Sequence, residues 1–193
     1  MPRQKIFKQD EVLTAATNLF WKQGYHQTSI HNLVHQSGIN RASLYNTFYD
    51  KENLFVQCFL MYRTNVVNYI NGIIKSEKTA KNTLRVLFNS LYESYEKENG
   101  KGCLICNSYA ELLPTDNKLM IGLLNDTKEI ISHLILDILK KAQLNKELKK
   151  NTDIVLMTES IYTSMVGTAI LSKLENKETI KNKTLHHYLL MFM

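Results

Sequence analysis

Apolar residues recur at three- and four-residue spacing along almost the whole chain, and the alternation typical of strands is nearly absent. The chain of 193 residues contains only two prolines and seven glycines, so few residues interrupt this helical pattern. We therefore predict an all-α protein. The expected helices span about 8–23, 29–37, 41–48, 51–74, 78–97, 103–112, 118–143, 153–174 and 178 to the end.

Turn and capping residues divide the N-terminal part into short helices. Gly24 and Gly38 stand where a helix end requires left-handed backbone. Thr28, Asn40 and Asp50 precede helices and are expected to accept hydrogen bonds from unsatisfied backbone N–H groups. Two short helices joined by a tight turn with Gly38 form a helix-turn-helix pattern, which presents its second helix to the major groove of DNA.

The second helix of this pair carries a polar face. At about 100° per residue, five side chains share one arc of the helix: Arg41, Ala42, Tyr45, Asn46 and Tyr49. Leu44 and Phe48 point away from it, towards the expected core. Arg41 suits guanine, Asn46 suits adenine and Ala42 suits a thymine methyl group, so we expect this face to read double-stranded operator DNA.

A second group of polar residues is expected to contact the phosphate backbone, which fixes the register of a protein on DNA. Helix N-termini are also suited to phosphate. The predicted phosphate contacts are Ser43, Tyr45, Tyr49, Thr28 or Ser29, and Lys51.

The net charge of +6 is compatible with a polyanionic partner but is weak evidence alone. Its distribution is more informative, because residues 1–65 hold seven basic and four acidic side chains, a higher basic excess per residue than the rest of the chain has.

Residues 10–55 resemble the DNA-binding domain of the tetracycline-repressor (TetR/AcrR) family almost without gaps. The residues that carry the resemblance are Val12-Leu13-Thr14-Ala15-Ala16, Leu19-Phe20, Gly24-Tyr25, Thr28-Ser29-Ile30, Ser37-Gly38-Ile39, Ala42-Ser43-Leu44-Tyr45, Phe48 and Lys51-Glu52-Asn53-Leu54-Phe55. Tyr49-Asp50 departs from the common pattern of the family. The resemblance implies a homodimeric regulator in which residues 1–50 bind DNA and residues 51–193 form a helical domain for a small-molecule effector and for dimerisation. We interpret it as a repressor that an unknown small apolar or electrophilic compound releases from its operator. An activator would show the same sequence features.

The segment Gly102-Cys103-Leu104-Ile105-Cys106 resembles a motif of one branch of the family, which includes regulators of drug-efflux and stress-response genes. Cys103 would lie in the first turn of a helix, where the helix dipole lowers the pKa of a thiol. A redox- or electrophile-sensing cysteine is therefore one hypothesis. Burial of both cysteines as small apolar side chains is the commoner outcome.

Aromatic residues and methionines at helical spacing predict an apolar effector pocket in the second domain. The residues proposed for it are Tyr62, Tyr92, Cys103, Tyr109, Met120 and Tyr162. The last two helices are expected to form the dimer interface through Ile161, Met165, Ala169, Leu185, Tyr188 and Leu189. Closure of the protomer's own core is the alternative for these residues.

The sequence gives little support for other classes of protein. The sequence contains no glycine-rich phosphate loop, nucleophile elbow or zinc-binding His-Glu-x-x-His motif, so we expect neither an enzyme nor a cofactor. Cys103 and Cys106 are not accompanied by a second ligand pair, and we predict no metal site. Glu93, Glu96, Glu98 and Glu111 are interpreted as carboxylates of solvated faces. The three cysteines and the absence of a long uninterrupted apolar run favour a cytoplasmic protein without a membrane span.

Overall fold

The computed structural model describes residues 9–97, 101–171, 187–190 and 192. These residues form eight α-helices and no β-strand beyond one isolated bridge between Leu148 and Phe192, as expected for an all-α protein. The helices are α1 (Gln9–Gln23), α2 (Ile30–Ser37), α3 (Arg41–Phe48), α4 (Lys51–Ser76), α5 (Ala80–Lys97), α6 (Leu104–Leu112), α7 (Lys118–Leu144) and α8 (Ile154–Leu171). Each starts within two residues of its predicted start. The helix expected from residue 178 onwards lies mostly outside the described residues.

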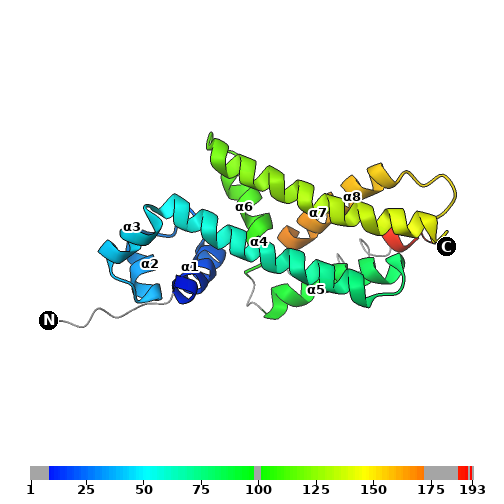
Figure 1. Cartoon of the computed structure of the whole chain (residues 1–193). Helices are drawn as coiled ribbons and strands as arrows, with labels where there is room; N and C mark the ends of the chain where they lie inside the picture. The colour runs from blue at the N-terminus through cyan, green and yellow to red at the C-terminus, as the bar shows by residue number, and fades with distance from the viewer. Residues whose placement is uncertain (1–8, 98–100, 172–186, 191, 193) are drawn as a thin grey trace.

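The molecule is elongated (Figure 1). Helices α1–α3 form one end, and the long helix α4 leads from them into a larger bundle of α5, α7 and α8. Helix α6 lies between the two parts and contacts α1, α4, α7 and α8.

The capping residues explain why the N-terminal helices are short. Gly24 and Gly38 adopt positive φ angles of 82° and 68°, and the Gly38 N–H donates to Val34 O, which closes the end of α2. Asn40 and Asp50 cap α3 and α4 as predicted, since their side chains accept from the N–H groups of Ser43 and Asn53.

The predicted N-cap of α2 was wrong by one residue. Ser29, not Thr28, accepts from the N–H of Asn32, at 3.1 Å. Thr28 is fully buried and its hydroxyl donates to Gly24 O at 2.6 Å. The buried Thr28 side chain therefore stabilises the α1–α2 turn from its core side.

One continuous apolar core runs from the N-terminal helices to the end of the chain. At the N-terminal end, the Phe20 ring of α1 meets the Phe55 ring of α4 edge-on, with 5.1 Å between centroids. Leu44 and Phe48 of α3 are also fully buried in this core, so α3 is held rigidly against the rest of the molecule.

Helix α8 is long and apolar enough to cross a membrane by length and composition alone. Core helices of soluble proteins pass the same test, so this single helix is weak evidence for a span.

Candidate nucleic-acid interface and buried cavity

The exposed face of α3 has the composition that the sequence predicts. Arg41, Ala42, Tyr45, Asn46 and Tyr49 are all exposed, whereas Leu44 and Phe48 on the opposite side are buried. The Arg41 guanidinium lies 5.7 Å from the centroid of the Tyr45 ring, a cation–π contact that restricts both side chains. The face thus offers positioned hydrogen-bond donors and acceptors on a rigid helix.

Tyr49 ends this face in an uncommon conformation. Its φ is 68°, in the region that favours glycine, and its side chain is 76% exposed. A bulky residue with positive φ stores about 1–3 kcal/mol of backbone strain. An exposed aromatic side chain gives no packing energy that offsets this cost, which suggests that function rather than stability requires it.

The predicted phosphate contacts divide into two groups. Ser29 is exposed at the first turn of α2 and Ser43 is half-buried in the first turn of α3, so both lie near the open N–H groups of their helices. Thr28 is fully buried, so its side chain cannot contact DNA without unfolding the turn.

The Lys51 side chain forms its contacts within the protein. Its Nζ donates to Tyr25 O at 2.8 Å and to Thr28 O at 3.0 Å, and it lies 4.3 Å from the centroid of the Tyr25 ring. Burial lowers the pKa of Lys51, and the nearby Glu111 carboxylate opposes that shift. Lys51 therefore holds the α1–α2 turn, a role that sequence reasoning missed because it depends on a tertiary contact.

Glu111 was wrongly interpreted as a solvated carboxylate. Its two oxygens accept from the backbone N–H groups of Tyr25 at 2.8 Å and His26 at 2.6 Å, 86 and 85 residues away in the chain. Glu93 is exposed as predicted. The side chains of Glu96 and Glu98 lie outside the described residues.

A cavity of 130 Å³ lies in the bundle among α4, α5, α6, α7 and α8. The side chains around it are mostly aliphatic or aromatic, and none of them carries a formal charge. Its polar groups belong to Tyr62, Tyr69, Ser90, Tyr162 and the two cysteines of α6. Such a cavity fits a small neutral apolar molecule.

The predicted pocket residues are only partly brought together. Tyr62, Cys103 and Tyr162 line the cavity. Met120 does not, because it is buried in the core elsewhere on α7, and Tyr109 touches the cavity only through Tyr162. The Tyr92 side chain lies outside the described residues.

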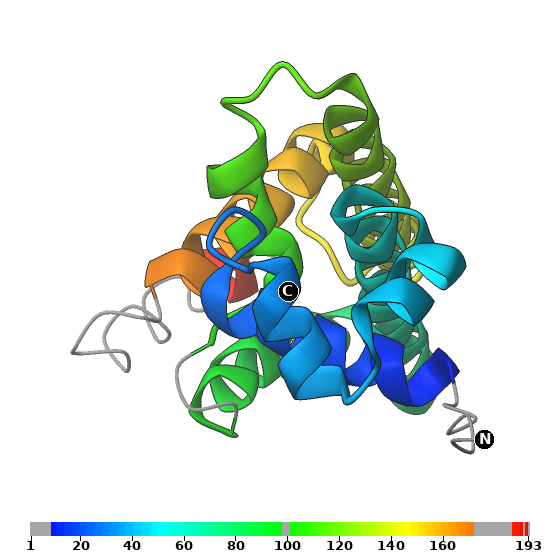
Figure 2. The same ribbon diagram turned by 90° about the vertical axis from the view of Figure 1, so that its left-hand side faces the viewer.

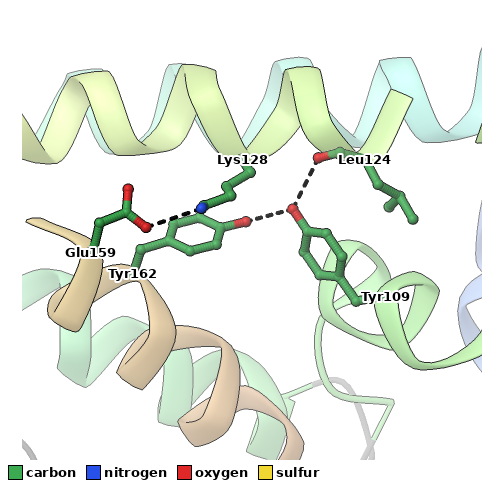
Figure 3. Close-up of polar contacts among 5 residues, drawn as sticks. All are labelled: Tyr109, Leu124, Lys128, Glu159 and Tyr162. Atoms are coloured by element: carbon green, nitrogen blue, oxygen red, sulfur yellow. Dashed lines mark hydrogen bonds and ion pairs between the residues drawn. The ribbon is translucent and has the colours of Figure 1, made fainter. Parts of the chain in front are cut away.

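Two tyrosines and a carbonyl form a partly buried polar chain (Figure 3), and Tyr162 also lines the cavity. The Tyr109 hydroxyl donates to Leu124 O at 3.0 Å and therefore accepts from the Tyr162 hydroxyl, 2.6 Å away. Burial raises the pKa of both phenols. Lys128 of α7 and Glu159 of α8 form an exposed ion pair at 3.0 Å.

Cys103 occupies the N-cap of α6, at the cavity wall. Its pKa is lowered chiefly by the Cys106 thiol, and also by the N–H groups of Cys106 and Ile105 and by the Tyr62 hydroxyl, although burial opposes the shift. Cys58 differs, because burial raises its pKa to about 12. Among the described residues, no group of three or more His, Cys, Asp or Glu side chains could hold a metal ion.

The residues expected at a dimer interface mostly serve the protomer itself. Ile161, Ala169 and Tyr188 are buried within the single chain, and Met165 and Ala169 line the cavity. The Tyr188 hydroxyl donates to Ser160 O at 2.7 Å and its ring stacks on Phe88. Leu189 packs against the core, and Leu185 lies outside the described residues. Ile161, Ala169 and Tyr188 therefore take part in the protomer's own core.

Comparison with known proteins bears directly on the N-terminal helices. Residues 12–58 match the family model described as bacterial regulatory proteins, tetR family. The chain therefore carries the DNA-binding domain of the TetR family. It is thus a DNA-binding transcriptional regulator, in agreement with the resemblance in its sequence.

Relatives match over nearly the full length. An uncharacterised HTH-type transcriptional regulator, YezE of Bacillus subtilis (strain 168), is 27% identical over 177 residues, 90% of each chain. The transcriptional repressor ComR of Escherichia coli (strain K12) is 25% identical over 173 residues, 89% of this chain and 82% of ComR. A cysteine mutant of the TetR-family regulator CifR, solved with 26-base-pair operator DNA, shares the fold with a TM-score of 0.85 and 21% identity, over 99% of this chain and 100% of CifR.

Proposed function

We propose that this TetR-family regulator is a cytoplasmic homodimeric repressor that a small neutral compound releases from its operator. Residues 1–50 serve as the DNA-reading domain and residues 51–193 as the effector and dimerisation domain. The observation that carries the proposal is the exposed face of α3, which combines base-reading side chains with two fully buried anchors, Leu44 and Phe48.

Each residue of this face has a distinct role in the proposal. Arg41 and Asn46 read guanine and adenine in the major groove, and Ala42 lies against a thymine methyl. Tyr45, Tyr49, Ser43 and Ser29 hold phosphates and so fix the register. Thr28 and Lys51 support the turn behind α2 instead of touching DNA.

Two similar proteins support repression. ComR is described as a repressor, and the CifR structure contains operator DNA. A repressor needs only to occupy its operator and leave it on demand, which a DNA-reading domain joined to a ligand-binding domain can do.

The uncharged cavity supports a neutral effector. Its 130 Å³ is close to the roughly 150 Å³ of an engineered apolar cavity that accepts benzene. The tyrosine hydroxyls and Ser90 could orient one polar group of a bound molecule.

Helix α8 supports dimerisation through residues other than those that the sequence suggested. Val155 and Leu156 are 64% and 66% exposed at its start, and Ile170 and Leu171 are 39% and 43% exposed at its end. Apolar side chains exposed along a helix mark an interaction surface. A second copy of the chain is the partner that paired half-sites require.

A thiol switch at Cys103 is a second candidate function. The observation that favours it is the set of donors around Cys103, which stabilises a thiolate at the cavity wall. A peroxide would oxidise this thiolate to a sulfenic acid with loss of hydroxide, and the Cys106 thiol would then displace water to form a disulfide. A peroxide titration of operator binding tests this function, since a Cys103→Ser protein that still responds excludes it.

Selection of random-sequence duplexes by the purified protein, followed by a salt titration of the best duplex, tests the proposed function. The expected result is a palindrome whose binding constant falls steeply with salt on logarithmic axes. A failure to enrich any sequence, together with a flat salt response, would refute operator recognition.

A further inference from the structure

A groove of 500 Å³ lies beside the cavity, between side chains of α1, α4 and α5. Four side chains line both the groove and the cavity, namely Tyr62, Val66 and Tyr69 of α4 and Ser90 of α5. Figure 2, viewed from the DNA-reading end, shows α1 in dark blue and the green end of α5 in the lower half of the view. Because the two spaces share part of their walls, a single molecule can reach into both.

The groove is more polar than the cavity. Its α1 side presents Thr14, Thr17 and Asn18, and Asn65 of α4 lines it as an exposed residue. Hydroxyl and amide groups both donate and accept hydrogen bonds. The cavity, by contrast, is lined mostly by aliphatic and aromatic side chains. The two spaces together suit an amphiphile, whose apolar chain would fill the cavity and whose polar head group would lie in the groove.

The charges around the groove favour a neutral head group. Among the described side chains that line it, only Glu93 of α5 carries a formal charge. This carboxylate repels an anionic head group but accepts hydrogen bonds from hydroxyls. A cationic head group would meet the Lys101 ammonium, which lies 5.0 Å from the centroid of the Trp21 ring. A head group with several hydroxyls and no charge avoids both repulsions.

Two aromatic rings give the groove a flat apolar surface. Trp21 is held in place, because its indole N–H donates to Gly102 O at 2.9 Å and its ring meets the Tyr62 ring edge-on, with 5.0 Å between centroids. Tyr69 also lines the groove and is 55% exposed. Such rigid rings lose little conformational entropy on binding. The C–H side of a sugar ring can pack on this surface while its hydroxyls reach the polar groups around it.

A hydroxyl on the α1 side of the groove has an unused hydrogen-bonding capacity. Thr17 is only 7% exposed, and its Oγ1 has no hydrogen-bond partner among the described residues. The neighbouring Cys58 thiol donates to Leu13 O instead, at 3.7 Å. Buried hydroxyls are normally satisfied by protein, water or ligand atoms. Thr17 stands one helical turn before Trp21, so its hydroxyl belongs to the same face of α1 as the aromatic surface.

From these features we infer that the groove binds the head group of the effector, and that the effector is a neutral amphiphile with a short apolar chain and a polyhydroxylated head group such as a sugar. The inference rests on the proposed function, because it names the class of compound that the cavity and the groove bind together. Thr17, Asn18 and Asn65 bind the hydroxyls, and Trp21 packs on the C–H side of the head group. The chain enters the cavity past Val66, which lines both spaces.

Hexyl glucoside, hexanol and glucose test the two parts of the site separately. Each is titrated into the full-length protein without DNA, below the concentration at which micelles form, and calorimetry measures the affinities. We expect hexyl glucoside to bind at least tenfold more tightly than hexanol and to compete with it, and its affinity to exceed that of butyl glucoside by about fourfold for each methylene. Trp21 is the only tryptophan of the chain, so its fluorescence reports binding in the groove. Hexyl glucoside should change this fluorescence much more than hexanol does.

Two variants locate the head group. Asn65→Ala should weaken binding of hexyl glucoside about fivefold and leave binding of hexanol unchanged. The matched control is Asn68→Ala, which alters an exposed asparagine of α4 outside the groove and should bind both compounds like wild type. Thr17→Val, which removes a hydroxyl at nearly constant volume, repeats the test if Asn65→Ala does not fold.

Three results would overturn the inference: equal affinity of hexyl glucoside and hexanol, no binding of hexyl glucoside, or tighter binding of hexyltrimethylammonium or hexanoate than of hexyl glucoside. The operator selection is a separate measurement. A protein that selects a palindrome but does not prefer hexyl glucoside retains the proposed DNA-binding function and loses this inference, whereas a protein that selects no duplex loses the proposed function itself.

Discussion

At the scale of single residues, Tyr49 and Lys51 show how surroundings change what a side chain does. Both residues stand at the C-terminal side of α3, and the sequence pattern predicts that both contact DNA. The structure leaves Tyr49 exposed in a strained conformation and places the Lys51 ammonium on two carbonyls of the α1–α2 turn. Two positions only two residues apart thus have different surroundings, since Tyr49 faces solvent and Lys51 supports the fold.

Replacing Tyr49 by glycine should separate stability from DNA binding. We expect Tyr49→Gly to raise the free energy of unfolding by about 1 kcal/mol, because strain relief exceeds the entropy cost of glycine, and to weaken operator binding about tenfold. Thermal unfolding and DNA titration measure the two effects. The matched control is Lys146→Gly, at another exposed non-glycine residue with positive φ, which should leave DNA affinity unchanged. Equal DNA affinity of Tyr49→Gly and wild type would show that Tyr49 does not contact the operator.

Replacing Lys51 by methionine should destabilise the DNA-reading domain. The change removes two hydrogen bonds and a cation–π contact and leaves two turn carbonyls without this donor, so we expect a loss of about 2 kcal/mol in the free energy of unfolding. Urea denaturation measures it, with exposed Lys22→Met as the control. If the two variants are equally stable, Lys51 does not hold the turn.

At the scale of helices, the sequence predicted the N-terminal part well because local chemistry determines it. Gly24, Gly38, Asn40 and Asp50 act on backbone groups a few residues away, so their effects can be predicted from sequence order alone. The error of one residue at Thr28 and Ser29 arose because two adjacent hydroxyl residues both suit a cap, and only the tertiary burial of Thr28 distinguishes them.

The roles of α8 and α6 were less predictable. Apolar residues occur on every side of α8, so the sequence cannot show that Met165 and Ala169 face the cavity while Val155 and Leu156 face solvent. Glu111 resembles any surface carboxylate until the fold brings it to Tyr25 and His26. Contacts between residues more than 80 positions apart leave no local pattern in the chain.

The N-terminal end of α6 gives a pH-dependent prediction. Because the pKa of Cys103 is lowered, its thiolate is stabilised in the fold; this stabilisation is present above the ordinary thiol pKa and is lost as pH falls through the lowered value. The alkylation rate by iodoacetamide should therefore change little between pH 7 and pH 8, whereas an ordinary thiol gains severalfold. Peptide mass spectrometry measures each site. Cys58, whose pKa is raised to about 12, is the internal control and should stay unmodified. A Cys103 rate that rises with pH like that of an unperturbed thiol would contradict the thiolate assignment.

At the scale of the whole molecule, the elongated shape separates the DNA-reading helices from the apolar surface of α8 (Figure 1). Two copies joined through that surface would present two α3 helices to one duplex, as paired half-sites require. Recognition of paired half-sites would therefore depend on dimerisation as much as on α3.

A charge in the α8 surface should separate the protomers. We expect Leu156→Glu to shift the protein from dimer to monomer and to lower its operator affinity at least tenfold, because a buried unpaired carboxylate is costly. Sedimentation velocity measures the assembly state. Leu119→Glu, which alters an exposed leucine at the start of α7, is the matched control and should remain dimeric. A Leu156→Glu protein that stays fully dimeric would place the interface elsewhere.

The central claim is that α3 reads the bases of an operator, and Asn46 tests it most directly. Duplexes selected from a random pool by wild type and by Asn46→Ala should share a palindrome, and the variant should lose the preference for one adenine in each half-site at a cost of about 1–3 kcal/mol. Exposed Arg85→Ala on α5 is the control and should select the wild-type sequence. If Asn46→Ala retains every base preference of the wild type, Asn46 of α3 does not read the operator.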